Sequence, residues 1–307
     1  MGARWHRHPT RLIWLLVLVG IAAVSSASIL IKLCAAPPLT IAAYRLSIAA
    51  GVFVAASLLK GGAVLRPFSP VQLRLALASG GFLCLHFATW ITSLRHTSVA
   101  SSVFLVQTAP IFVALGSYVV LREAPARLQV VGIGLAVLGG SIIASQDLSL
   151  GAMTVHGDLL AVAGALGAAG YWLAGRRLRV TIGILPYAAV VYSTAAVLLT
   201  ALALLSGAPL WPYPAHTLVL LVLIALVPQV IGHTSFNYGL RFLSASVVSV
   251  LVLGEPVGAT ILAYLVLGES ISAVKALGGI ITLVGVYLTA RAEPAARAEA
   301  NPVGETG

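Results

Sequence analysis

Charged residues are scarce in this chain of 307 residues: only 8% are Asp, Glu, Lys or Arg, whereas 60% are hydrophobic. A typical soluble domain has about 25% charged residues. The composition therefore excludes an ordinary soluble protein and predicts a polytopic membrane protein. Cysteine is scarcer still, because Cys34 and Cys84 are the only two and neither lies in a CxxC or CxxH pattern. The sequence predicts neither a disulfide framework nor a metal site.

Several motifs of enzymes are also absent. The chain has no HExxH, no paired-aspartate metal motif, no GxSxG and no P-loop. The connections between apolar runs are short, so none can form a separate soluble domain. We therefore expect neither an enzyme nor a cofactor, and any chemistry has to take place between helices.

What the chain does have is long apolar runs. A helix needs an apolar run of about 18 residues or more to cross the hydrocarbon of a bilayer, and we predict ten such spans in an all-α fold. The first continues to Leu33, which is too long for the apolar region of a cleaved signal peptide. The predicted spans are 12–33, 38–59, 71–94, 98–121, 127–146, 157–176, 182–205, 216–240, 244–267 and 273–290.

The basic residues indicate an orientation. A net charge of +10 suggests nucleic acid at first sight, but with the N-terminus inside, 14 of the 18 Lys and Arg fall on the cytoplasmic side. This bias fits the positive-inside rule, so no nucleic-acid partner is expected. We predict a multi-pass protein of the cell membrane with both termini in the cytoplasm. The predicted cytoplasmic residues are Arg4, Arg7, Arg11, Lys60, Arg66, Arg74, Arg122, Arg127, Arg176, Arg177, Arg179, Arg241, Arg291 and Arg297.

The stretch from residue 94 to 139 recurs without a gap 146 residues later. Proline, tyrosine, glutamate and glycine fall in one register, which favours duplication over chance similarity of apolar helices. Because each half would cross the bilayer five times, the two halves would point in opposite directions. We predict a cytoplasmic N-terminal segment (1–11), two inverted five-helix repeats (12–150 and 151–290) and a disordered cytoplasmic tail (291–307). Matching pairs include Pro110/Pro256, Tyr118/Tyr264, Glu123/Glu269, Gly132/Gly278 and Gly139/Gly285.

Three segments resemble a known family. They read PLTIAAYRLSIAAG, TSVASSVFLVQTAPIFVAL leading to LRE, and SASVVSVLVLGEPVGATILAYLVLGE. They look like EamA-type permeases of the drug/metabolite transporter superfamily. The resemblance implies a ten-helix permease that moves small metabolites, often by exporting amino acids or related solutes. Small multidrug-resistance relatives place a glutamate within the first helix, but the first and sixth predicted spans here have no acid at mid-depth, which argues against a simple exporter of cationic drugs.

Two ionisable residues lie well inside predicted spans: Arg45 and Glu255. Charges within the bilayer are costly and normally face the bundle interior or a watery cavity. Arg45 either binds a carboxylate or phosphate of the substrate or only snorkels and holds helices together. Glu255 precedes Pro256, which interrupts helical hydrogen bonding. Glu255 either carries a proton or binds a cation, or it pairs with an interior donor and anchors the kink.

Polar residues recur every four positions in the eighth span: Gln229, His233, Asn237 and Arg241. This spacing predicts one stripe along a helix. Lipid would reject such a stripe, so we expect the first three in the bundle, where they contact either substrate or only neighbouring helices.

In the third span, His86 and Trp90 share a helical face with Phe82. This face is either a stacking wall for a flat substrate or ordinary packing and interfacial anchoring. A histidine in this position either relays protons or stays neutral and hydrogen-bonded. Weaker candidates of the same kind are Gln107, Tyr171, Trp172 and Tyr192.

Glu123 and Glu269 each come just before a predicted span. Negative charge there complements a helix N-terminus, so we interpret both as structural caps. Pro110 and Pro256 are interpreted as residues that kink their helices.

These patterns favour a secondary transporter of small polar metabolites such as amino acids, working by alternating access around a central cavity. The predicted substrate-binding residues are Arg45, His86, Trp90, Gln229, His233, Asn237 and Glu255. Proton coupling is compatible with this reading, as is a monomer or a homodimer. The alternatives are a multidrug exporter of amphipathic compounds and a non-transporting membrane sensor or assembly subunit.

Overall fold

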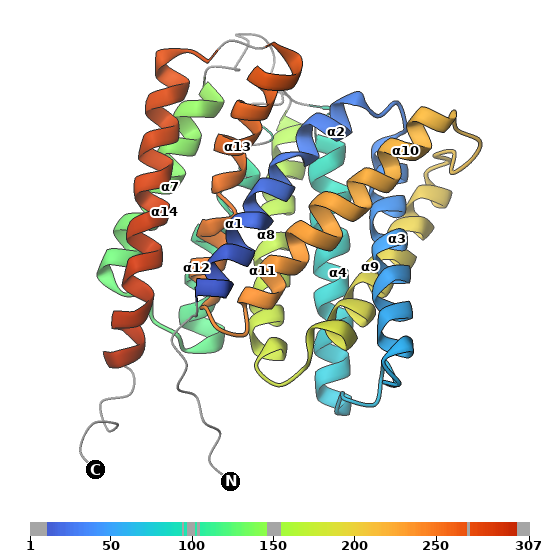
Figure 1. The fold of residues 1–307 in the computed structure, drawn as a ribbon, viewed down its shortest axis with the longest axis horizontal. Helices are drawn as coiled ribbons and strands as arrows, with labels where there is room; N and C mark the ends of the chain where they lie inside the picture. Colours follow the sequence, from blue (N-terminus) through green and yellow to red (C-terminus); the bar gives the residue numbers. More distant parts are fainter. Residues whose placement is uncertain are drawn as a thin grey trace.

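The computed structural model describes residues 11–93, 95, 96, 102, 105–145, 155–268 and 271–299. These residues form a bundle of helices with no strand among them (Figure 1). Seven helical segments are long and apolar enough to cross a membrane, and three shorter apolar helices cover Ala109–Leu121, Arg127–Ile142 and Ala276–Ala292. Together they match the positions of the ten predicted spans, although the start of the fourth falls partly outside the described residues.

The first half of the chain contains six α-helices and one π-helical segment among its described residues. They are α1 (Arg11–Ser25), α2 (Ala27–Leu33), α3 (Pro38–Leu59), α4 (Pro70–Ser93), α6 (Ala109–Gly116), η1 (Ser117–Leu121) and α7 (Arg127–Ser145). The second half follows the same order. It contains α8 (Val155–Arg179), α9 (Ile184–Leu205), α10 (Ala215–Ile224), η2 (Ala225–His233), α11 (Thr234–Gly239), α12 (Ala245–Leu251), α13 (Gly254–Leu262), η3 (Ala263–Leu267) and α14 (Ala273–Glu299).

The sequence repeat is visible in the backbone. The π-helical segments η1 and η3 lie 146 residues apart at both ends. Residues with left-handed backbone also recur 146 positions apart. Gly61 corresponds to Gly207 and Arg122 to Gly268, all with φ between 58° and 69°. These departures from regular α-helix recur at matching positions of the two halves, and this agreement does not depend on which apolar side chains happen to be identical. They support duplication more strongly than leucine and valine matches do.

Helices that correspond to each other in the two halves pack together and run in opposite directions. Helices α7 and α14 lie side by side (Figure 1). Gly132 approaches Gly285, whereas Gly139, later in α7, approaches Gly278, earlier in α14. Helices α3 and α9 are also in contact, and the hydroxyl of Thr40 at the start of α3 donates to the carbonyl of Pro209 beyond the end of α9.

The bundle is apolar outside as well as inside. Leu59 and Leu205, which are 146 residues apart, are 88% and 86% exposed, and many other large apolar side chains also face outward. In water such a surface would be unfavourable, whereas hydrocarbon solvates it. The largest buried cluster lies between α1, α3, α4, α6, α8, α9, α11 and α12.

Helix α14 extends beyond the predicted end of the second repeat at residue 290. It continues to Glu299, so residues 291–299 are helical although the sequence predicted a disordered tail there. The reason is that Ala, Arg and Glu, which dominate this segment, are strong helix formers. Residues 300–307 lie outside the described residues.

Candidate functional site

Three interrupted spans surround the centre of the bundle. The first span breaks at Ser26 between α1 and α2. The fourth breaks at Gln107 and Thr108 before α6, and the ninth breaks at Val252 and Leu253 between α12 and α13. The last two breaks lie within one residue of the same place in the repeat, just before Pro110 and Pro256. These prolines therefore do more than kink a continuous helix, because each lies in the first turn of a new one.

A cavity of about 130 Å³ lies at these breaks. The two repeats contribute corresponding segments to its wall, namely Val106 to Pro110 and Val252 to Pro256. Five of the seven predicted site residues line it: Arg45, His86, Trp90, His233 and Glu255. Interrupted helices at membrane depth are tolerated where they line a cavity, which is the arrangement here.

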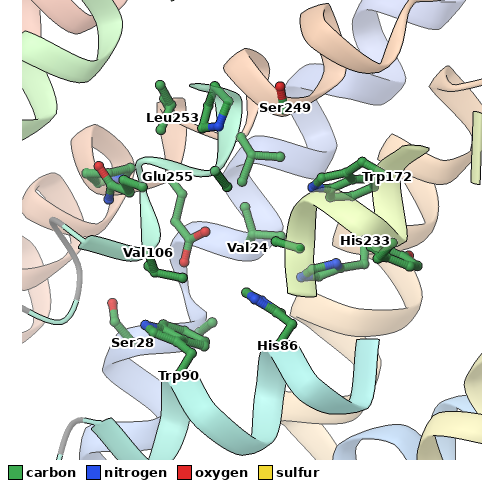
Figure 2. Close-up of a pocket in the computed structure, with 18 of the residues that line it drawn as sticks. Val24, Ser28, His86, Trp90, Val106, Trp172, His233, Ser249, Leu253 and Glu255 are labelled. Carbon is green, nitrogen blue, oxygen red and sulfur yellow. The ribbon is translucent and has the colours of Figure 1, made fainter. Parts of the chain in front are cut away.

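Glu255 lies in the first turn of α13. Its carboxylate points into the cavity between Val24 and Val106, toward His86 and Trp90 (Figure 2). Its backbone N–H donates to the carbonyl of Val252 at 2.9 Å. Its own carbonyl accepts a hydrogen bond of 3.3 Å from the Ser25 hydroxyl, which joins the break in the ninth span to the end of α1.

Arg45 is a buried charge about two turns into α3, with 1% of its surface exposed. Its Nε donates to Oε1 of Gln229 at 2.8 Å, and its guanidinium lies 4.3 Å from the centre of the Phe87 ring. Its Nη1 is buried without a hydrogen-bond partner among the described residues. The side chain is thus held on one side and retains an unused donor, although an arginine can grip a carboxylate with two parallel bonds.

Arg45 and Glu255, both in the described part of the chain, line the same cavity without forming a direct ion pair. Opposite charges that share a cavity of low polarity attract each other even without direct contact. An ion pair that neutralised both groups would leave little for a ligand to bind. Two separated, opposite charges instead offer complementary places for a ligand that carries both signs.

Aromatic rings form another part of the wall. His86 and Trp90 stack with centroids 5.7 Å apart, and His233 stacks on Trp172 at 6.0 Å. Nδ1 of His86 lies 2.9 Å from the carbonyl oxygen of Gly164. That oxygen can only accept, so we assign the proton to Nδ1, which leaves Nε2 of His86 as an acceptor.

The other two predicted site residues, Gln229 and Asn237, are fully buried but do not line the cavity. Gln229 bonds to Arg45, whereas the amide nitrogen of Asn237 donates to the hydroxyls of Tyr171 and Tyr192. Their expected regular stripe is altered because η2 is π-helical around Pro228, which has no N–H to donate. Both residues lie behind the cavity wall.

Several contributors to the site escaped the sequence-based prediction. Phe87 under Arg45 is apolar and therefore looks like any core residue. In the sequence, Arg179 looks like one of the basic residues that set the orientation of a helix in the membrane. In the structure it is buried, and its Nε donates to the carbonyl of Asn237 at 2.9 Å. By contrast, three of the four weaker candidates, Gln107, Tyr171 and Trp172, line the cavity as predicted, whereas Tyr192 does not.

The interpretation of Glu123 as a helix cap was wrong. Helix α7 begins at Arg127 and has no acidic residue in its first turn. The Glu123 carboxylate instead accepts hydrogen bonds from Arg176. Glu269 lies outside the described residues, so its predicted cap stays a prediction.

The model of the EamA-like transporter family matches residues 10–145 and again residues 155–291. The chain belongs to the EamA-like transporter family. This confirms the resemblance seen in the sequence and identifies a multi-pass membrane transporter built from two EamA repeats.

Two comparisons agree with this family. An uncharacterized transporter from Archaeoglobus fulgidus is 27% identical over 255 residues, which cover 82% of this chain and 87% of the relative. One solved crystal structure matches 92% of this chain and 99% of its own with a TM-score of 0.77 at 20% identity. That likeness shows the fold of this EamA protein.

Proposed function

We propose that this EamA protein is a permease for small zwitterionic metabolites, such as amino acids, which it moves by alternating access. The observation that carries the proposal is the pair of unpaired, opposite charges, Arg45 and Glu255, that share one cavity. The substrate carboxylate would bind Arg45 and its ammonium group would bind Glu255. His86 and Trp90 would contact the part of the substrate that lies between its carboxylate and its ammonium group.

The small cavity favours metabolites over amphipathic drugs. Its volume of about 130 Å³ is close to that of a cavity of about 150 Å³ that accommodates benzene. A drug-sized ligand needs a pocket of about 300–1,000 Å³. A multidrug exporter is therefore the second candidate, and it would require the cavity to expand.

The proposed mechanism follows from the two repeats, 12–150 and 151–290, arranged as inverted five-helix units. The antiparallel pairing of α7 with α14 supports this arrangement. One repeat would rock against the other around the cavity, exposing it to each side in turn. Both termini would lie in the cytoplasm of the cell, and protonation of Glu255 would offer a route to proton coupling.

The test is counterflow of radiolabelled amino acids in liposomes that contain the purified protein. Each active substrate is then competed with two analogues, one without the carboxylate and one without the amine. Arg45→Ala should reduce uptake about tenfold or more, because it removes a hydrogen bond to a charged group, and should weaken competition mainly by carboxylate-bearing compounds. Glu255→Gln should weaken competition mainly by amines. Arg74→Ala, at an exposed arginine outside the cavity, is the matched control.

Three results would decide against the proposal. Unchanged flux in both Arg45→Ala and Glu255→Gln would remove the site. Transport of lipophilic cations but not amino acids would favour the multidrug alternative. Absence of counterflow for every solute in the panel, with correctly folded protein, would favour a sensor or an assembly subunit.

A further inference from the structure

We propose that Glu123 and Arg176 form a latch that holds the two repeats together at one face of the membrane and opens in each transport cycle. The proposal rests on the alternating-access part of the proposed function. It assigns a role to Glu123, which recurs in register as Glu269 and does not line the cavity. Arg176 lies at the end of α8, and this helix ends at the face where α1 begins and α14 ends, which is the lower face in Figure 1.

The latch joins both repeats through one guanidinium. Nε and Nη2 of Arg176, at the end of α8, both donate to Oε1 of Glu123, at 3.2 and 3.1 Å. Nη1 of the same side chain donates to the carbonyl of Leu240, beyond the end of α11, at 3.0 Å. Glu123 belongs to the first repeat, whereas Arg176 and Leu240 belong to the second.

Backbone geometry positions Glu123 for this contact. The residue before it, Arg122, adopts a left-handed conformation with φ of 58°, which ends the π-helical segment η1. The N–H of Glu123 then donates to the carbonyl of Ser117 at 2.9 Å. The carboxylate is therefore held by a defined turn and not by a flexible loop.

Arg176 lies one helical turn beyond Trp172, which lines the cavity. Next to it, a Cβ on Gly175 would lie 2.7 Å from the hydroxyl of Tyr187 and 2.9 Å from Cδ1 of Leu240. The end of α8 is thus in close contact with α9 and with the residue after α11, about one helical turn from the cavity wall. Gly175, Tyr187 and Leu240 all belong to the second repeat, so they hold Arg176 in place, and movement of one repeat against the other has to break the bonds from Arg176 to Glu123.

The pair is suited to reversible closure. The Glu123 side chain is 37% exposed and that of Arg176 is 15% exposed, so water can replace their contacts when the helix ends separate. Ion pairs in such settings shift equilibria by only about two- to five-fold. A latch of that strength biases the closed state without preventing turnover.

The experiment measures access to the cavity by thiol labelling. Ser249, which lines the cavity from α12, is changed to Cys after the buried residues Cys34 and Cys84 are replaced by Ala. A membrane-impermeant maleimide is added to vesicles of either orientation. A separate Arg177→Cys protein identifies the side that carries the latch, because Arg177 is exposed.

Glu123→Gln should raise the labelling rate of Ser249→Cys from the latch side by about two- to five-fold and lower it from the opposite side. The charge exchange Glu123→Arg with Arg176→Glu should restore the original rates only in part, because a carboxylate at position 176 cannot donate to the carbonyl of Leu240. Arg177→Gln, which removes the adjacent exposed charge, should leave both rates unchanged. Partial unfolding would instead increase labelling from both sides and would not be reversed by the exchange.

The proposal is overturned if Glu123→Gln leaves both rates unchanged, if Arg177→Gln has the same effect, or if labelling rises from both sides. Because labelling needs no substrate, the outcome is independent of whether amino acids are the cargo. A latch without amino-acid counterflow would refute the proposed substrate alone. Counterflow without any labelling change would refute the latch alone.

Discussion

The chemistry of the cavity depends on how Arg45 is held. A free arginine side chain has many rotamers, and fixing it on binding costs conformational entropy. Here Gln229 and Phe87 hold the guanidinium before a ligand arrives. Gln229 is therefore better described as a residue that positions the binding group than as a substrate contact.

This role predicts that Gln229→Leu will weaken substrate binding while leaving Arg45 in place. Loss of a hydrogen bond to a charged group corresponds to about 1.5–3 kcal/mol, so the apparent affinity should fall about tenfold or more. Equilibrium binding of a radiolabelled substrate to purified protein is the measurement. In an Arg45→Ala background the same change should have little further effect. Full additivity of the two substitutions would contradict a positioning role.

Some site residues were predictable and others were not, for a physical reason. Arg45 and Glu255 stand out because charge in an apolar run has few explanations. Phe87 could not be found this way, since one phenylalanine among many apolar residues carries no signal until the fold places it beneath a guanidinium. Arg176 was hidden in the same manner, because arginines at helix ends also serve as orientation signals.

At the scale of helices, glycine determines how closely α7 and α14 approach. A Cβ on Gly132 would contact the Thr289 side chain and lie 2.7 Å from the carbonyl oxygen of Gly285. Small residues at such crossings let helix backbones come together in membranes. Gly134, only two residues away, is exposed and has nothing within 4 Å of its would-be Cβ.

Gly132→Ala should therefore destabilise the protein by about 1–3 kcal/mol, the typical cost of forcing extra volume into a packed contact. Gly134→Ala is the matched control and should be neutral or slightly stabilising, because alanine is the better helix former. Thermal unfolding in detergent, reported as Tm, compares the two. Equal Tm values for both variants would show that the α7–α14 contact does not need the glycine.

Element positions followed closely from hydropathy, but the helix interruptions did not. The spans 38–59 and 182–205 correspond to α3 (Pro38–Leu59) and α9 (Ile184–Leu205), since apolar length alone defines them. Pro256 signalled a disturbed helix, yet the sequence did not show that the span separates into two helices. That outcome depends on what fills the gap, including the Ser25 hydroxyl from another span.

For the whole molecule, duplication explains why the contacts come in related sets. The third span of the first repeat, α4, packs on the first span of the second repeat, α8. Correspondingly, the first span of the first repeat, α1, packs on the third span of the second repeat, η2 and α11. Likewise α6 packs on α8, as α13 packs on α1. Such an exchange is expected when two similar units face each other across a pseudo-two-fold axis, and it places the cavity between them.

The inverted arrangement predicts that corresponding loops lie on opposite sides of the membrane. Lys60 and Ser206 are 146 residues apart, are both exposed, and precede the left-handed turns at Gly61 and Gly207. In a protein without other cysteines, Ser206→Cys should react with an impermeant maleimide added to intact cells. Lys60→Cys should react only after the cells are permeabilised, because basic loops stay in the cytoplasm. Reaction of both from the same side would mean that the repeats are parallel, and a rocking cycle built on inversion would then be untenable.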